Sequence, residues 1–230
     1  MIIPEGARQE IKFVTNSYNL SKILLWIKSS NCMFISPYPE RWVNNIYFDT
    51  YNYQNYQENL SGESIRRKLR YRWYNNESEI SPGRLEMKLK RNFFGWKEIY
   101  RVMENPYSEG GNWKETISNI SNAIPESASQ ILKLTNFPVI INRYKRMYFI
   151  SADKKIRVTV DQDQSVCDQR YKQYPNFKKK ANLPDTIVIE FKFSRDDVGE
   201  ASNAMQGFPV RVSKHSKYMN AVDAVTWNRC

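Results

Sequence analysis

Hydrophobic and polar residues alternate with a period of two along much of the chain, and this pattern predicts β-strands. The alternating segments are residues 11–15, 45–49, 66–74, 84–91, 96–102, 139–149, 156–161 and 187–193. Most of them follow one another as hairpin neighbours, which favours antiparallel pairing. The sequence therefore predicts an eight-stranded antiparallel sheet or barrel.

Three segments have the spacing of helices. Leu20, Ile23, Leu24 and Ile27 share one helical face, and a second helical region spans 113–134 with a break at Pro125. A third should begin near Ser213 and carry one apolar face, formed by Tyr218, Met219, Val222 and Val225. The polar stretches 104–112 and 169–184 are expected to be loops, and residues 1–230 a single α+β domain.

The residues that alternate with the apolar ones are mainly cationic. In the third strand Arg66, Lys68, Arg70 and Arg72 occupy one face. An antiparallel sheet with one face in water alternates in this way. The other interpretation is a barrel whose cations line a wet interior. Like charges at successive positions repel unless a multivalent anion lies opposite, which favours the barrel.

Composition narrows the chemistry. The chain of 230 residues has a net charge of +11, 8 glycines and one histidine, His215. It lacks both common glycine-rich phosphate loops, and a single histidine excludes H-E-x-x-H zinc sites and other multi-histidine metal centres. The three cysteines show no C-x-x-C spacing and are expected to be reduced. No signal peptide or membrane-spanning run is evident, so we expect a cytoplasmic protein. The excess of positive charge predicts an anionic partner.

A series of short motifs resembles the VTC domain, the polyphosphate polymerase domain of vacuolar transporter chaperone proteins and their bacterial relatives, within the triphosphate tunnel metalloenzyme (CYTH-like) superfamily. The motifs follow in order as Arg8-Gln9-Glu10-Ile11-Lys12-Phe13, Ile46-Tyr47-Phe48-Asp49-Thr50, Arg67-Lys68-Leu69-Arg70-Tyr71-Arg72, Leu85-Glu86-Met87-Lys88-Leu89-Lys90, Arg143-Tyr144-Lys145-Arg146, Arg157-Val158-Thr159-Val160-Asp161, Ile189-Glu190-Phe191-Lys192 and Ser213-Lys214-His215-Ser216-Lys217-Tyr218. Together they cover nearly the whole chain.

This resemblance implies an eight-stranded antiparallel β-barrel, the triphosphate tunnel, with flanking helices. It implies an enzyme that transfers the γ-phosphate of ATP to a growing polyphosphate chain with Mn²⁺ or Mg²⁺. The implied catalytic cations are Lys12, Arg70, Arg72, Lys88, Lys97, Arg146, Arg157, Lys214 and Lys217. Tyr144, Ser216 and Lys90 would bind substrate, and Glu190, Glu86 and Glu10 would bind the metal.

Other interpretations of these residues stay open. Lys214 and Lys217 could form a solvated helix face, Glu86 and Glu190 could pair with lysines across strands, and Tyr144 could only pack. The first strand has Arg8 where hydrolytic relatives have glutamate, which argues against the alternative of a metal-dependent triphosphatase. A non-catalytic polyphosphate- or nucleic-acid-binding module is the other alternative, although no nucleic-acid motif is evident. Eukaryotic relatives carry transmembrane helices, and no such segment is evident in this sequence, so any membrane coupling would need a separate membrane partner.

Overall fold

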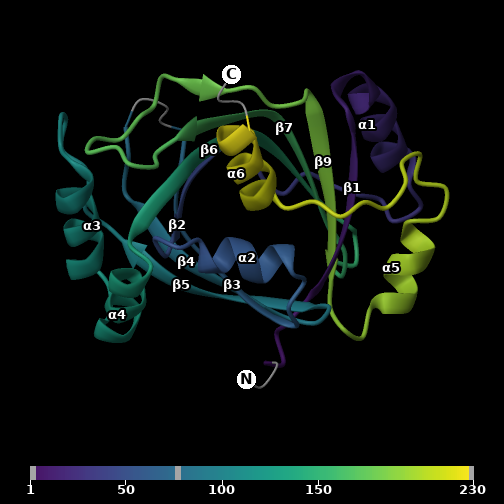
Figure 1. The fold of residues 1–230 in the computed structure, drawn as a ribbon. Helices are drawn as coiled ribbons and strands as arrows, with labels where there is room; N and C mark the ends of the chain where they lie inside the picture. The colour runs from purple at the N-terminus through teal and green to yellow at the C-terminus, as the bar shows by residue number, and fades with distance from the viewer. Residues whose placement is uncertain (1–3, 76–78, 228–230) are drawn as a thin grey trace.

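The computed structural model describes residues 4–75 and 79–227, and within them one antiparallel sheet of nine strands dominates (Figure 1). The strands are β1 (Gln9–Asn16), β2 (Arg41–Asp49), β3 (Ile65–Tyr74), β4 (Gly83–Arg91), β5 (Phe94–Val102), β6 (Phe137–Ile150), β7 (Arg157–Asp168), β8 (Lys180–Ala181) and β9 (Thr186–Phe193). Their order is β1-β9-β7-β6-β2-β3-β4-β5, with β8 paired to β7. All eight predicted strands are therefore confirmed, and only the two-residue β8 was not expected.

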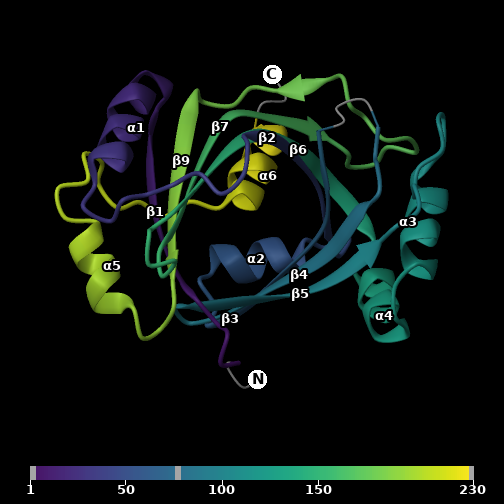
Figure 2. The ribbon, with the colours of Figure 1, turned by 180° about the vertical axis from the view of Figure 1, so that it is seen from behind.

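The sheet curves until its two edge strands approach each other (Figures 1 and 2). β1 and β5 meet at one isolated bridge, in which Arg8 and Gly95 exchange two backbone hydrogen bonds of 3.0 Å. No ladder joins these edges among the described residues, whereas every other neighbouring pair of main strands has one. The predicted α+β class is confirmed, but the expectation of a closed barrel needs correction, because the sheet is strongly curved and not fully hydrogen-bonded around its circumference.

The convex face of the sheet is apolar and is covered by helices. Helices α3 (Trp113–Asn122) and α4 (Glu126–Leu134) pack on β3 and β4 through a cluster that includes Trp113, Leu132 and Trp73. Helices α1 (Leu20–Ser29), which follows the 3₁₀ turn Ser17–Asn19, and α5 (Val198–Ala204) cover β7 and β9. Because apolar side chains turn outward against helices, the alternating polar side chains turn to the concave side.

Helices α2 (Gln54–Leu60) and α6 (Lys217–Trp227) lie within the curve of the sheet, as Figures 1 and 2 both show. Tyr47 and Ile140 of the concave face pack against Tyr218 and Val222 of α6. The ring centroids of Tyr47 and Tyr218 are 5.1 Å apart in a stacked arrangement. One end of the concave face is thus covered by an aromatic and aliphatic cluster.

The helix predictions are confirmed in their main features. The break at Pro125 separates α3 from α4, and α6 begins at Lys217, a few residues after the predicted start. Helices α2 and α5 were not predicted. Cys32 and Cys167 are free thiols, while Cys230 and residues 1–3 lie outside the described residues. Among the described residues, no helix has the length and apolar character needed to span a membrane.

Candidate functional site

The concave surface between the edges of the sheet, here called the inner face, collects charged side chains from separate strands. Its charged residues include Glu10 and Lys12 of β1, Arg41 of β2, Arg66, Lys68, Arg70 and Arg72 of β3, Arg84, Glu86, Lys88 and Lys90 of β4, Lys97 and Arg101 of β5, Arg146 of β6, Arg157 and Asp161 of β7, and Glu190 and Lys192 of β9. Lys217 of α6 joins them from within the curve. Cationic side chains outnumber the acidic ones on this face.

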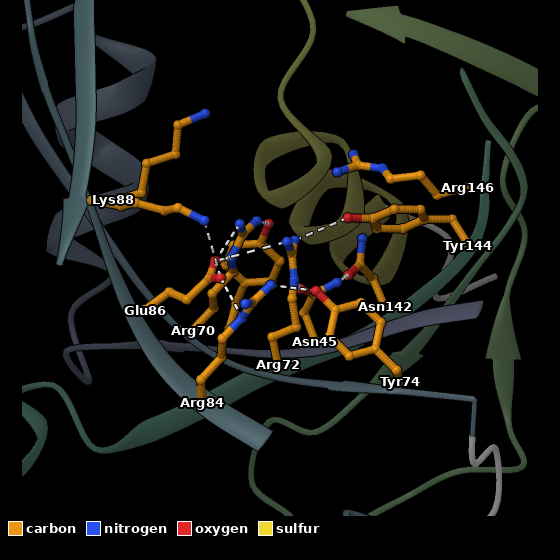
Figure 3. Close-up of polar contacts among 12 residues, drawn as sticks. Asn45, Arg70, Arg72, Tyr74, Arg84, Glu86, Lys88, Asn142, Tyr144 and Arg146 are labelled. Carbon is orange, nitrogen blue, oxygen red and sulfur yellow. Dashed lines mark hydrogen bonds and ion pairs between the residues drawn. The ribbon is translucent and has the colours of Figure 1, made fainter. Parts of the chain in front are cut away.

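Glu86 is the centre of the first group on the inner face (Figure 3). Its side chain is fully buried, and Arg70 donates to Oε2 from Nη2 at 2.6 Å and from Nε at 2.9 Å. Arg84 lies 2.8 Å from Oε1, and Lys97 and Arg72 lie at 3.5 and 3.8 Å from the carboxylate. Burial opposes ionisation, but the four cations hold the pKa of Glu86 well below its usual range.

A second group joins β1, β4 and β9 around Lys12. The Lys12 ammonium lies 2.8 Å from Glu10 Oε1 and 3.5 Å from Glu190 Oε1. Lys88 reaches Glu10 Oε2 at 3.1 Å, and Lys192 reaches Glu190 Oε2 at 2.5 Å. One ammonium thus links two carboxylates that come from neighbouring strands.

The pKa values in this group follow from the pairing. Burial opposes the charge of Lys12, but Glu10 and Glu190 raise its pKa above the usual lysine value. For Lys88, attraction by Glu10 raises the pKa, while burial and the charge of Lys12 lower it, and the result is a pKa of about 8. Glu190 is buried, which opposes ionisation, yet Lys192, Lys217 and Lys12 hold its pKa well below the usual value.

The third group is built on Arg146 and Asp161. Arg146 makes a bidentate pair with Asp161, with Nε to Oδ1 at 2.5 Å and Nη2 to Oδ2 at 2.6 Å. Lys217 approaches Asp161 Oδ2 at 2.5 Å and lies 4.8 Å from the centroid of the Tyr144 ring. The Tyr144 hydroxyl accepts a 3.0 Å hydrogen bond from Arg72. The contacts of this third group therefore connect β3, β6, β7 and α6.

A β-bulge determines which residues of β7 reach the inner face. The register between β6 and β7 shifts between Arg143 and Lys145, and Asp163 opposite adopts a φ of 52°. A shift of one residue exchanges the two faces of a strand. Asp161 consequently pairs with Arg146 on the inner face, where an unbroken register would direct it outward.

The segment that leads into α6 is attached to the inner face. The Ser213 amide donates to the carbonyl of Lys12 at 2.8 Å, and Lys12 Nζ donates to the carbonyl of His215 at 2.9 Å. Ser216 Oγ accepts from Lys68 Nζ at 2.9 Å. Burial and the nearby Lys217 and Lys12 lower the pKa of His215 to about 4, so the only histidine is neutral near pH 7.

Some predicted site residues lie apart from these groups. Arg157 is exposed at the end of the inner face, and Lys97, although it reaches Glu86, is also exposed. Lys90 is half-buried beyond Lys88 on β4. Lys214 is exposed and its side chain contacts none of the described residues through an ion pair.

Several residues of the network were not predicted as site residues. They are Lys68, Arg84 and Lys192, together with the amides Asn45 and Asn142, which bond to each other at 2.8 Å while Asn45 accepts from Arg72 at 2.7 Å. The alternation of residues in β3, β4 and β9 already placed the charged members on the cationic face. No sequence signal marked the two asparagines, because neither is charged and neither lies within one of the quoted motifs.

The divalent metal implied by the resemblance fits Glu10 and Glu190 better than Glu86. Glu10 and Glu190 converge on one ammonium, and the buried hydroxyl of Thr159, opposite Glu190 in the ladder, has no partner among the described residues. Glu86 and Glu190 each lie within 4.0 Å of four cations, so the ammonium that Glu190 shares with Glu10 is what distinguishes the Glu10–Glu190 site. The described residues contain no group of three or more His, Cys, Asp or Glu that could hold a metal. Mg²⁺ is commonly held by one or two carboxylates plus phosphate oxygens, which two glutamates satisfy.

Comparisons with known proteins agree with this architecture. The family model of the VTC domain matches residues 7–226. A solved structure from Vibrio parahaemolyticus, provisionally described as an adenylate cyclase, is 12% identical over 91% of this chain and 95% of that chain, with a TM-score of 0.50. A Pyrococcus horikoshii protein is 11% identical over 93% and 96%, with a TM-score of 0.48. At such identities the first likeness shows a shared fold alone. None of the curated proteins matches the chain.

Proposed function

Because the chain belongs to the VTC domain family, we propose that it is an ATP-dependent polyphosphate polymerase, which transfers the γ-phosphate of ATP to a growing polyphosphate chain. One observation carries the proposal. The cations that the family motifs supply from distant segments, among them Lys12, Arg70, Lys88, Arg146 and Lys217, lie together on one inner face. A linear polyanion is the ligand class that such a face would bind.

The chemistry needs little more than position and charge. Phosphoryl transfer proceeds through charge spread over the phosphate oxygens, and a protein assists it mainly by orienting the groups and stabilising that charge. The terminal phosphate of the acceptor chain is already anionic, so no general base has to activate it. A neutral, half-buried His215 agrees with a reaction that uses no histidine base.

The acidic residues of the inner face would act as counter-ions before substrate binds. Glu86 keeps Arg70 and Arg84 extended toward the interior, and Asp161 does the same for Arg146. Phosphate oxygens would then meet cations that are already ordered, which lowers the entropic cost of binding. Arg70 and Arg146 would offer bidentate contacts, while Lys12, Lys88 and Lys217 would offer point charges.

A divalent ion, Mn²⁺ or Mg²⁺, would be held by Glu190 with Glu10. When bound, it would neutralise charge on the phosphate oxygens. The role of this chain would be to supply those two carboxylates and to keep Lys12 between them in the free protein. ATP and polyphosphate are the proposed ligands. Three expectations from the sequence stay predictions: that the protein binds no nucleic acid, that it has a separate membrane partner, and that it is cytoplasmic.

The test is incubation of the pure protein with ATP and Mn²⁺ or Mg²⁺. Long polyphosphate with stoichiometric ADP would support the polymerase. Orthophosphate without polymer would indicate a triphosphatase of the same fold, and tight polyphosphate binding without turnover would indicate a non-catalytic binder. Arg70→Ala should abolish synthesis, whereas Arg67→Ala should leave it intact, because Arg67 is an exposed residue near the start of β3 that points away from the inner face. Synthesis that survives Arg70→Ala in a folded protein would contradict the assigned site.

A further inference from the structure

At the end of the inner face away from α6, aromatic rings alternate with arginines. We call this set the rim cluster: Tyr38, Arg41, Tyr74, Arg84 and Tyr148. Arg41 is the first residue of β2, Tyr74 the last of β3, and Arg84 lies at the start of β4. The segment between α1 and β2, which carries Tyr38, passes across this end of the sheet (Figure 2).

The guanidinium of Arg41 lies among three rings. Its Cζ atom is 4.5 Å from the centroid of Tyr74, 4.9 Å from that of Tyr148 and 5.5 Å from that of Tyr38. Its Nε donates to the Tyr148 hydroxyl at 3.1 Å, and the Tyr38 and Tyr148 rings meet edge to face at 5.8 Å. Cation–π contacts of this kind fix a guanidinium plane in one orientation.

The rim cluster is continuous with the cations of the inner face. Arg41 stands directly opposite Arg146 in the β2–β6 ladder, and Tyr74 follows Arg72 by two residues, roughly 7 Å along the strand. Arg84 contacts both the Tyr74 hydroxyl and Glu86, as Figure 3 shows. From Lys68 to Tyr74, β3 extends about 20 Å, enough for a triphosphate and the nucleoside attached to it.

The rim cluster has accessible aromatic surface, unlike the other end of the inner face. The side chain of Tyr38 is 56% exposed, and Tyr74 and Tyr148 are half-buried. At the α6 end, Tyr47 and Tyr218 are buried against each other, and the Tyr218 hydroxyl is bound to Asp49. A planar group can therefore be added to the rim cluster without unpacking the core.

We propose that the rim cluster binds the base of a nucleoside triphosphate by stacking on the exposed ring of Tyr38, which the Arg41 guanidinium contacts, while the phosphates extend onto the inner face. Aromatic rings and arginine planes are the surfaces on which proteins stack bases, and stacking alone tolerates any base. The inference rests on the proposed function, since it takes ATP as the donor. It adds a prediction of its own, that GTP binds about as tightly as ATP.

The experiment measures binding by calorimetry at one metal concentration, with a non-hydrolysable β,γ-imido analogue of ATP, with inorganic tripolyphosphate and, for the base preference, with the corresponding GTP compound. Tyr38→Ala should weaken binding of the analogue roughly 5- to 100-fold. Tripolyphosphate binding should change less than about twofold, because it has no base. Tyr38→Phe keeps the ring and should bind like the wild type, and Tyr174→Ala, at a tyrosine of similar exposure far along the sequence, is the matched control.

The outcomes separate this inference from the proposed function. Selective loss of analogue binding in Tyr38→Ala supports the base site. Unchanged binding of both ligands, or an equal loss for both, overturns it and leaves the polymerase proposal standing. A strong preference for ATP over GTP would also overturn it, since stacking gives no readout of base edges. A wild-type protein that binds neither ligand would overturn the inference and the proposed function together.

Discussion

The buried carboxylate of Glu86 is the counter-charge for several cations of the inner face. Changing Glu86→Gln keeps its shape but leaves Arg70 and Arg84 without their counter-charge. Removing one partner of a buried ion pair typically costs about 3–5 kcal/mol, and we expect a loss of that size in the free energy of unfolding. Urea denaturation would measure it, with exposed Glu98→Gln as the control, expected to change stability by about 0.5 kcal/mol or less. Equal stability of the two variants would contradict the counter-ion role.

Lys88 gives the site a pH dependence. Its pKa of about 8 lies below the usual lysine value of 10.5, and a bound phosphate favours the charged form and raises that pKa. Affinity for tripolyphosphate is therefore full below about pH 8 and falls as the pH rises through that value. Lys88→Arg keeps its charge, so the fall between about pH 7 and pH 9.5 should be smaller in calorimetric titrations.

The control for this pH dependence is the exposed Lys114→Arg, which should keep the wild-type profile. Lys97, whose side chain is 44% exposed, also has a pKa of about 8, because its partial burial lowers the pKa against the attraction of Glu86, so Lys97→Arg should remove part of the remaining slope. A profile that neither substitution alters would assign the pH dependence to the ligand alone.

At the scale of elements, the start of α6 presents two predicted ligands through the packing of Tyr218: Lys217, its first residue, and Ser216, which precedes it. The Tyr218 ring is 1% exposed, and its hydroxyl donates to Asp49 Oδ2 at 2.5 Å. Tyr218→Ala should cost about 3–5 kcal/mol of unfolding free energy and weaken tripolyphosphate binding. Tyr218→Phe should cost about 1 kcal/mol, because Asp49 still accepts two or more backbone N–H bonds.

Thermal and urea unfolding, with binding measured on the folded fraction, would check both variants. If Tyr218→Ala behaved like Tyr218→Phe, the aromatic packing would not be what holds α6 in place. If the Ala variant lost stability but kept full affinity, Ser216 and Lys217 would not need α6 to be fixed.

The sequence predicted strands better than helices, for a physical reason. Each strand carries a period-two pattern because one face packs on helices and the other is charged. Helix α2 has no such pattern: it is short and polar, it follows Tyr53 in a left-handed conformation, and its buried residues are Asn55 and Glu58. Helix α5 buries only Ala201. Tertiary packing, not local periodicity, determines both.

The same limit applies to the site. Motif order identified residues of the inner face, and alternation placed most of them on one side of their strands. The link between Asn45 and Arg72 depends on which strands are neighbours, which only the fold reveals. The exposure of Lys214 likewise depends on where α6 begins.

At the scale of the whole molecule, the edges of the sheet meet at the Arg8–Gly95 bridge, and the Lys88–Glu10 ion pair joins β4 to β1 across the same gap. Fewer hydrogen bonds protect these edges, so their amides should exchange with solvent faster than those of the central β6–β7 ladder. Bound tripolyphosphate would contact Lys12 and Lys88 on opposite sides of the gap and should slow this exchange. Hydrogen exchange followed by mass spectrometry would measure both effects, and uniform exchange rates would contradict them.

The single bridge has a consequence for the width of the enclosed space. In a fully closed barrel, strand number and shear fix the diameter. Here the circumference is not fixed in that way, because one of its eight junctions consists of two hydrogen bonds and side-chain ion pairs. The diameter is therefore free to adjust to an occupant of the interior. The proposed ligand, a chain of repeating phosphates, has a constant cross-section, so the sheet would be able to narrow around it at any point along that chain.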